Sequence, residues 1–204
     1  YFAMRRDGSF MASLPDYAEL HCLSNFSFLR GASHPEELVA QAVAQGYTAL
    51  ALSDECSLAG VVRAHLAAQQ AGLKLIVGSE MRTVDGLKLV FLAQNREGYG
   101  NLSALITLAR RRAAKGAYTL RRHDLNGVSP NGALPDCLVL WVPDGTPAPA
   151  DGRWLAERFP GRAWVAVELH AGPDDAARLE VLQALGAASG LPLAAAGDVH
   201  MHVR

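Results

Sequence analysis

Apolar, strand-like runs recur along this chain, and they end in side chains that could bind a metal ion. These side chains are His21, Asp54 with Glu55, Glu80, His170, and Asp198 with His200. Helical segments separate many of the runs, so the pattern predicts parallel strands joined by right-handed crossovers. In a closed parallel barrel the strand ends meet at one mouth, and we therefore expect these residues to lie close together.

The predicted elements alternate between strands and helices. Strands are expected at 17–22, 48–53, 73–78, 87–93, 139–142, 163–169 and 191–196, and helices after Ser33, after Ser57, and at 101–114, 154–159 and 173–189. Ser33 is expected to cap the first helix in a capping box with Glu36, and Ser57 could cap the second. About seven strands without a Gly-x-Gly-x-x-Gly turn favour an α/β fold with a closed, somewhat irregular barrel over an open dinucleotide-binding sheet. The strand at 87–93 follows a short Asp85-Gly86 turn, so we expect it to pair as a hairpin or at an edge.

Composition narrows the class of protein. A length of 204 residues with 50% hydrophobic content suffices for one domain, and the net charge of −1 excludes a strong overall attraction to nucleic acid. Three cysteines without a Cys-x-x-Cys pair fit a reducing cytosol. No run approaches the ~18 apolar residues of a membrane span. We expect a cytoplasmic protein without membrane contact, and we interpret residues 1–16 as an expression remnant or a flexible N-terminal extension.

Most candidate ligands also have a structural explanation. Asp54 is placed where it could cap a helix. Asp198 and His200 alternate along one strand, so they could hold one ion together or form a buried ion pair. Glu80 ends a very apolar run, where a carboxylate needs a partner such as a metal or a histidine. The basic cluster between 110 and 122 is either a solvated helix end or a nucleic-acid contact.

Several segments resemble successive motifs of the PHP (polymerase and histidinol phosphatase) domain, which opens bacterial C-family replicative DNA polymerase α subunits. These segments are 21–31, 49–54, 76–80, 92–102 and 197–200. The stretches HCLSNFSFLRGASHPEEL and GDVHMHVR resemble the error-prone, damage-inducible branch of that family. The resemblance covers residues 17–204 and implies the N-terminal PHP domain of a longer polymerase that acts in translesion synthesis.

The resemblance also assigns roles to individual positions. PHP domains fold as distorted (β/α)7 barrels, so the resemblance implies an α/β fold of this type. Complete PHP domains hold up to three metal ions for phosphoester hydrolysis or proofreading. Positions that keep a ligand of the family are His21, Glu80, Asp198 and His200. Glu55 stands where a histidine is expected, and His170 lies in a stretch that often supplies a ligand. Positions that have lost a ligand are Leu23 for histidine, Arg30 for aspartate and Pro143 for cysteine.

These replacements predict a degenerate metal site. Leu23 has no lone pair to offer, and Arg30 carries a fixed positive charge that repels Zn²⁺ or Mn²⁺ and could pair with Glu80 or Asp198 instead. We therefore expect no catalytic residue in this chain, and no metal or one adventitious Zn²⁺ or Mn²⁺ on the four retained ligands. The domain would then have a structural and docking role. The alternative is a metal-dependent phosphoesterase or 3′–5′ exonuclease that uses the surviving ligands.

The implied parent is a DNA-directed DNA polymerase, a nucleotidyltransferase that uses Mg²⁺ in a palm domain beyond Arg204. Its implied partners are the remaining palm, thumb and fingers domains, DNA, the sliding clamp and translesion accessory proteins. The isolated chain is expected to lack polymerase activity because it contains no palm.

Overall fold

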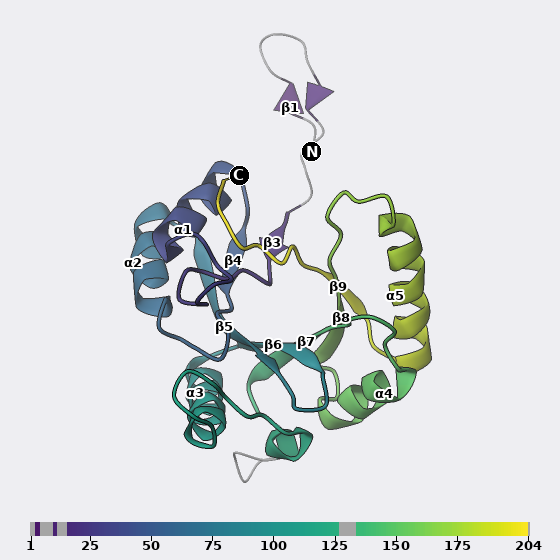
Figure 1. Ribbon diagram of the computed structural model, residues 1–204. Coiled ribbons are helices and arrows are strands. Elements are labelled where there is room, and N and C mark those ends of the chain that lie inside the picture. Colours follow the sequence, from purple (N-terminus) through teal and green to yellow (C-terminus); the bar gives the residue numbers. More distant parts are fainter. Residues whose placement is uncertain (1–2, 5–9, 12–15, 127–133, 204) are drawn as a thin grey trace.

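The computed structural model describes residues 3–4, 10–11, 16–126 and 134–203. Seven strands form one sheet in the order β3-β4-β5-β6-β7-β8-β9, and the sheet curls into a ring with the helices outside it (Figure 1). The strands are β3 (Ala18–Glu19), β4 (Ala49–Leu52), β5 (Lys74–Arg82), β6 (Lys88–Ala93), β7 (Cys137–Val142), β8 (Ala163–Val167) and β9 (Leu193–Ala195). The predicted distorted seven-stranded barrel is confirmed. A separate antiparallel pair joins β1 (Ala3–Met4) to β2 (Phe10–Met11).

The two ends of the sheet meet just beyond β3 and β9. The Val199 amide donates to the His21 carbonyl at 2.9 Å, and the Leu23 amide donates to the Val199 carbonyl at 2.8 Å. Cys22 and Val199 accordingly pair as a parallel bridge. This bridge nearly closes the barrel and brings the first and last candidate ligands of the sequence to the same place.

Strand β6 interrupts the parallel order of the sheet. This strand pairs antiparallel with both β5 and β7, whereas the other neighbouring strands of the ring run parallel. The Asp85-Gly86 turn is too short for a crossover helix, so the chain reverses into a hairpin. The hairpin expectation is confirmed, and β6 lies inside the sheet rather than at an edge.

Five helices and one 3-10 segment surround the described part of the barrel. They are α1 (Pro35–Ala44), α2 (Val61–Ala71), α3 (Arg96–Arg111), η1 (Arg122–Asn126), α4 (Pro149–Arg158) and α5 (Asp175–Ser189). Helix α3 begins earlier than predicted because the Asn95 side chain caps it by accepting from the Gly98 amide at 2.9 Å. Helix α4 also begins earlier, with Pro149 in its first turn, a position that proline favours.

The predicted serine caps are wrong for two helices. His34, not Ser33, is the N-cap of α1, and the Glu37 carboxylate accepts from the His34 amide at 2.7 Å. Gly60, not Ser57, precedes α2. Ser33 and Ser57 each lie in the loop that leads to the helix.

Strand β6 divides the core into two layers. Val90 and Leu92 face the barrel interior with Leu140 and Ala166, whereas Phe91 packs in the layer beneath the outer helices. Burial on both faces explains why this strand reads as a continuous apolar run. None of the described helices is long and apolar enough to cross a membrane.

Candidate metal centre at the barrel mouth

The structure brings three of the predicted ligands together. His21 follows β3, Glu80 lies near the end of β5, and Asp198 follows β9. Each of the three offers a ligand atom, and these atoms lie within 4.8 Å of one another. The convergence that the strand-end pattern predicted is therefore present for these residues.

His21 is fully buried at the centre of this group. Its Nδ1 lies 2.6 Å from Glu168 Oε1 and 3.3 Å from Asp198 Oδ1, and its Nε2 lies 2.9 Å from Glu80 Oε2. Burial alone lowers the pKa of His21, but the hydrogen bonds to Glu168 and Glu80 outweigh it and raise the pKa to about 9. Ionised carboxylates only accept hydrogen bonds, so both ring nitrogens donate and the imidazole is protonated near neutral pH.

Arg30 binds Glu80 through two hydrogen bonds. Its Nη1 donates to Oε1 at 2.6 Å and its Nη2 donates to Oε2 at 2.9 Å, while Nη1 also reaches Glu55 Oε2 at 2.9 Å. Burial raises the pKa of Glu80, but the bonds from His21 and Arg30 lower it far below its ordinary value. The predicted pairing of Arg30 with a surviving carboxylate is confirmed for Glu80.

Lys88 places a second cation beside the same carboxylates, and the sequence analysis did not identify it. Its Nζ lies 3.4 Å from Glu80 Oε2 and 3.8 Å from Asp198 Oδ1, and the residue is only 8% exposed. A signal was available in the sequence. Lysine at the start of a strand that is apolar throughout is almost never buried without an acidic partner.

Glu168 was also missed as a candidate, although it ends the run that forms β8. It is 4% exposed and lies in a second group of potential ligands with His170 and Asp198. His170 is exposed, and His200 Nε2 lies 3.0 Å from Asp198 Oδ1. The four predicted ligands were His21, Glu80, Asp198 and His200. The structure gathers the first three, and it places Asp198 in a second group with Glu168 and His170 that does not include His200.

Asp54 has a different role from those considered for it. It is 1% exposed, and its carboxylate accepts from the Ser24 amide and hydroxyl, both at 2.8 Å, and from the Ser27 hydroxyl at 2.7 Å. These bonds hold the loop that follows His21. Asp54 is neither a helix cap nor part of the two groups of potential ligands.

The remaining replaced positions lie outside the ionic cluster. Leu23 is fully buried, and the Pro143 carbonyl accepts a hydrogen bond from Arg178 at 3.3 Å. Glu55 does reach the cluster, because its Oε2 accepts from Arg30 at 2.9 Å. Its Oε1 accepts from the Tyr118 hydroxyl at 3.1 Å, so Glu55 links Arg30 to Tyr118.

The cluster as arranged does not fit a metal ion. Both nitrogens of His21 face carboxylate oxygens at hydrogen-bond distance, so neither presents a lone pair. Both oxygens of Glu80 accept from Arg30, and Lys88 lies beside them. A divalent cation here would face two fixed positive charges from Arg30 and Lys88.

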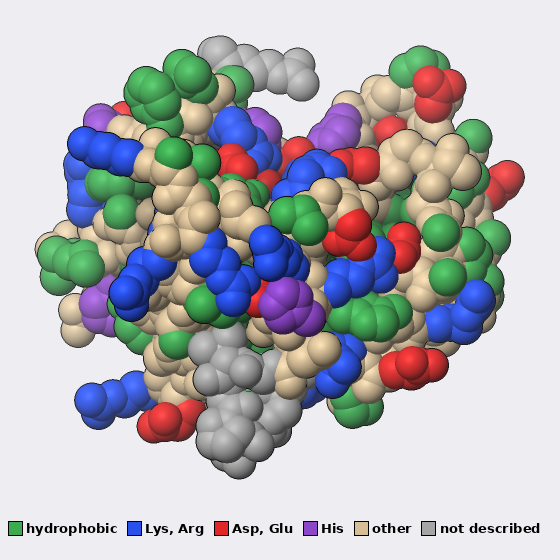
Figure 2. All heavy atoms as spheres, turned by 60° about the horizontal axis from the view of Figure 1, so that its bottom comes forward, with side chains coloured by type: hydrophobic (Ala, Val, Ile, Leu, Met, Phe, Trp, Pro, Cys, Tyr) green, Lys and Arg blue, Asp and Glu red, His purple; other side chains and the backbone are tan. Residues whose placement is uncertain are grey.

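Much of the basic cluster at the end of α3 is engaged in bonds within the domain. Arg110 donates to the carbonyls of Glu55 and Cys56, and Arg112 pairs with Asp124 at 2.5 Å. Figure 2 shows Lys and Arg side chains gathered on the face that carries α3 and η1. Asp124 balances the charge of Arg112, whereas Arg110 keeps its charge because carbonyls are neutral, so the nucleic-acid interpretation of 110–122 stays a prediction.

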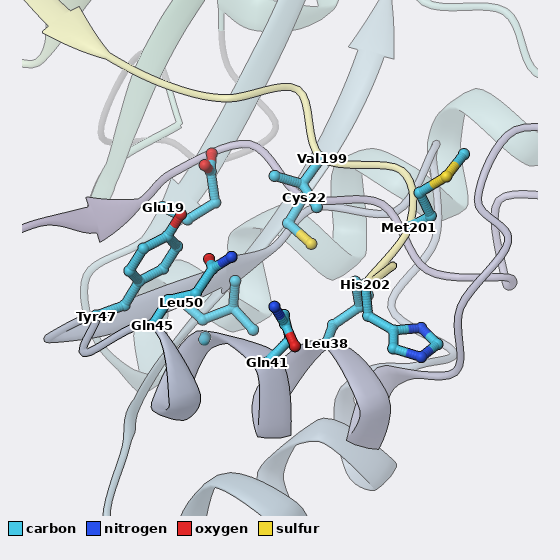
Figure 3. A pocket seen from close by; sticks show the side chains of 11 residues that line it. Glu19, Cys22, Leu38, Gln41, Gln45, Tyr47, Leu50, Val199, Met201 and His202 are labelled. Carbon is cyan, nitrogen blue, oxygen red and sulfur yellow. The ribbon is translucent and has the colours of Figure 1, made fainter. Parts of the chain in front are cut away.

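A pocket of about 170 Å³ lies apart from the cluster, between α1 and the C-terminal tail. Figure 3 shows Gln41 and Leu38 of α1 on one side of it and His202 of the tail close by, with Cys22 above. Burial raises the pKa of Cys22 well above its ordinary value, so the thiol stays protonated. The pocket therefore lacks an activated nucleophile.

Comparison with known proteins identifies the family of the chain. The model of the PHP domain family matches residues 19–129. The chain is 78% identical over 192 residues to an error-prone DNA polymerase of Dechloromonas aromatica (strain RCB), a match over 94% of this chain and 19% of that protein. It is 56% identical over 215 residues to an error-prone DNA polymerase of Azoarcus sp. (strain BH72), over 93% of this chain and 20% of that protein. The chain thus spans about a fifth of the length of these relatives.

Solved structures show the same fold at low sequence identity. A candidate metal-dependent phosphoesterase from Bifidobacterium adolescentis superposes with a TM-score of 0.64 at 17% identity, over 92% of this chain and 88% of that one. An amidohydrolase from Chromobacterium violaceum, with bound sulfate and no metal, superposes with a TM-score of 0.57 at 15% identity, over 90% and 87% of the two chains. With its barrel, its cluster of acidic residues and histidines at the mouth, and a family match over more than half of its length, the chain belongs to the PHP domain family.

Proposed function

We propose that residues 17–204 form the N-terminal PHP domain of an error-prone DNA polymerase that acts in damage-induced translesion synthesis in the cytoplasm, with residues 1–16 outside the fold. The identity to two error-prone polymerases supports this assignment. Nucleotide transfer would belong to a Mg²⁺-dependent palm domain elsewhere in the parent chain. DNA, the sliding clamp and translesion accessory proteins would be partners of that parent.

We further propose that the domain is a scaffold rather than an enzyme. The carrying observation is the two-bond contact of Arg30 with Glu80, with Lys88 beside it. The guanidinium and the ammonium provide the positive charge that metal ions provide in a complete PHP site. Side-chain cations cannot activate water as a metal does, so the arrangement favours a structural role.

The charges at the mouth support this proposal. Positive charge comes from Arg30, Lys88 and protonated His21, and negative charge from Glu55, Glu80, Glu168 and Asp198. A nearly balanced ionic network can persist in a buried site because each charge has a partner. The mouth is thus held together by residues of the chain itself.

Chelation of the purified domain tests the scaffold proposal. We expect the melting temperature to be the same with and without EDTA, and the same after addition of Zn²⁺ or Mn²⁺, because only an ion that binds the native state raises its stability. A fall of several degrees in EDTA, recovered by a metal, would refute the proposal.

A phosphoesterase or 3′–5′ exonuclease is the second candidate function. It is favoured by the second group of potential ligands, Glu168, His170 and Asp198, in which His170 is exposed and, among the described residues, no pair of carboxylates bonds to it as Glu80 and Glu168 bond to His21. Hydrolysis of p-nitrophenyl phosphate, or shortening of a DNA 3′ end in Mn²⁺, would support it if the activity copurifies with the domain and is lost in Asp198→Ala. Primer extension by the isolated domain would contradict both candidates.

A further inference from the structure

Two consecutive apolar side chains project from the loop after β3. Phe28 is 84% exposed and Leu29 is 90% exposed, more than any other large hydrophobic side chain of the described residues. Large apolar residues gain free energy when water is removed from them. An adjacent pair held in solvent is therefore suited to contact another surface.

The loop that presents this pair is fixed on both sides. The Arg30 and Gly31 amides both donate to the Ser27 carbonyl at 3.0 Å, and the Ser27 hydroxyl donates to the buried carboxylate of Asp54. Arg30 is in turn clamped onto Glu80. These bonds fix the position of the backbone on both sides of Phe28 and Leu29.

The backbone at the tip supports the same interpretation. Leu29 has a φ of 63°, in the left-handed region that a branched apolar residue rarely adopts. An exposed leucine in solvent would ordinarily relax from this conformation. The surrounding hydrogen bonds enforce it, and the result is that Phe28 and Leu29 point away from the barrel as a preformed contact.

The end of the described chain lies beside this loop. The Ala32 amide donates to the His200 carbonyl at 2.8 Å, and the His202 amide donates to the Ser33 hydroxyl at 2.8 Å. Figure 3 shows the tail with Met201 and His202 passing over α1. Residues 200–202, close to the last described residue Val203, are thus bonded to the end of the loop that carries Phe28.

We infer that Phe28 and Leu29 anchor the domain to the remainder of its own polymerase chain, by inserting into an apolar pocket of the part that would follow Arg204. This inference rests on the proposed parent, whose relatives are about five times as long as this chain. A tethered segment has a high effective concentration near its point of attachment, which favours it over a separate protein as the occupant. Arg30 directly follows Phe28 and Leu29, so one loop carries both the anchor and a residue of the ionic cluster.

Photo-crosslinking in the full-length polymerase tests the anchor. Benzoylphenylalanine is placed at position 28 and, as matched controls, at the exposed positions Leu66 of α2 and Val181 of α5. We expect position 28 alone to give an efficient crosslink, to a peptide beyond residue 204 of the same chain, with a yield independent of protein concentration.

The other outcomes separate the anchor from the parent proposal. A crosslink from position 28 to a second copy or to another protein would overturn the inferred occupant. Efficient crosslinks from 66 or 181 and none from 28 would overturn the anchor while leaving the docking role intact. Crosslinks from none of the positions would contradict both.

A paired set of variants provides a second readout that does not depend on crosslinking chemistry. In the full-length protein, Phe28→Ser with Leu29→Ser should increase severalfold the rate of proteolytic cleavage just after the domain. The control Val62→Ser with Leu66→Ser removes a similar exposed apolar pair from α2 and should leave that rate unchanged. Equal rates in the two double variants would overturn the anchor.

Discussion

Arg30 and Glu80 form a two-bond ion pair at the mouth of the barrel, with distances of 2.6 and 2.9 Å between guanidinium nitrogens and carboxylate oxygens. The Glu80 side chain is 3% exposed and that of Arg30 is 29% exposed. The resemblance to PHP domains puts Glu80 among the expected metal ligands, and in this structure Arg30 binds both of its oxygens. If the domain is a scaffold, this ion pair should stabilise the fold.

Arg30→Ala should reduce the free energy of unfolding by about 3 kcal/mol, because it leaves a buried carboxylate with fewer partners. Arg30→Lys should recover only part of the loss, since an ammonium cannot make both parallel bonds. Chemical denaturation of the purified domain measures both variants. The control is Arg63→Ala, which breaks an exposed pair with Glu36 and should cost no more than about 1 kcal/mol. Equal costs at positions 30 and 63 would show that the mouth pair is not structural.

Asp54→Ala should destabilise the domain by about 3 kcal/mol, because the Ser24 and Ser27 donors lose a buried acceptor. The same change should make the loop around Phe28 a site of rapid proteolysis. The control Asp174→Ala, at an exposed residue without a side-chain cap bond, should change stability by about 0.5 kcal/mol or less. An intact loop in Asp54→Ala would mean that other bonds suffice to hold it.

Stability should fall as the pH rises from about 6.5 to 9. The pKa of His21 is raised to about 9 in the folded state, so its protonated form stabilises the fold fully below the unfolded pKa of about 6.5, and this contribution is lost as pH rises through the folded pKa. The loss should be on the order of 3 kcal/mol. Denaturation of wild type and His21→Gln across this range isolates the effect, because other titrating groups are common to both proteins. Parallel pH profiles would contradict the protonated imidazole.

The sequence was sufficient to predict the barrel and the meeting of His21, Glu80 and Asp198, because strand ends in this architecture converge whatever the details of packing. The reversal at β6 could not be read from periodicity, since a strand buried on both faces looks apolar in either direction. Only the short turn at Asp85-Gly86 gave a local hint.

The partners within the site were harder to predict than its location. Arg30 could be expected to pair with an acid, but which acid depends on loop geometry that the bonds of Asp54 determine. Lys88 and Glu168 were overlooked because each lies in or at the end of an apolar run. A single charged residue at such a position is usually taken as a sign that the strand begins or ends there. Their burial beside opposite charges is a tertiary property.

Metal content after dialysis tests the central claim most directly. Wild-type domain incubated with Zn²⁺ or Mn²⁺ and then dialysed should retain well under one equivalent, because Arg30 and Lys88 already lie beside the Glu80 carboxylate and both nitrogens of His21 face carboxylate oxygens. The triple variant Leu23→His, Arg30→Asp and Lys88→Ala should retain more metal than the wild type and gain thermal stability from it. The double variant Leu23→His with Arg30→Asp should retain less metal than the triple variant, because Lys88 is still present. Two or more equivalents retained by the wild type would contradict the scaffold account and make the phosphoesterase the leading candidate.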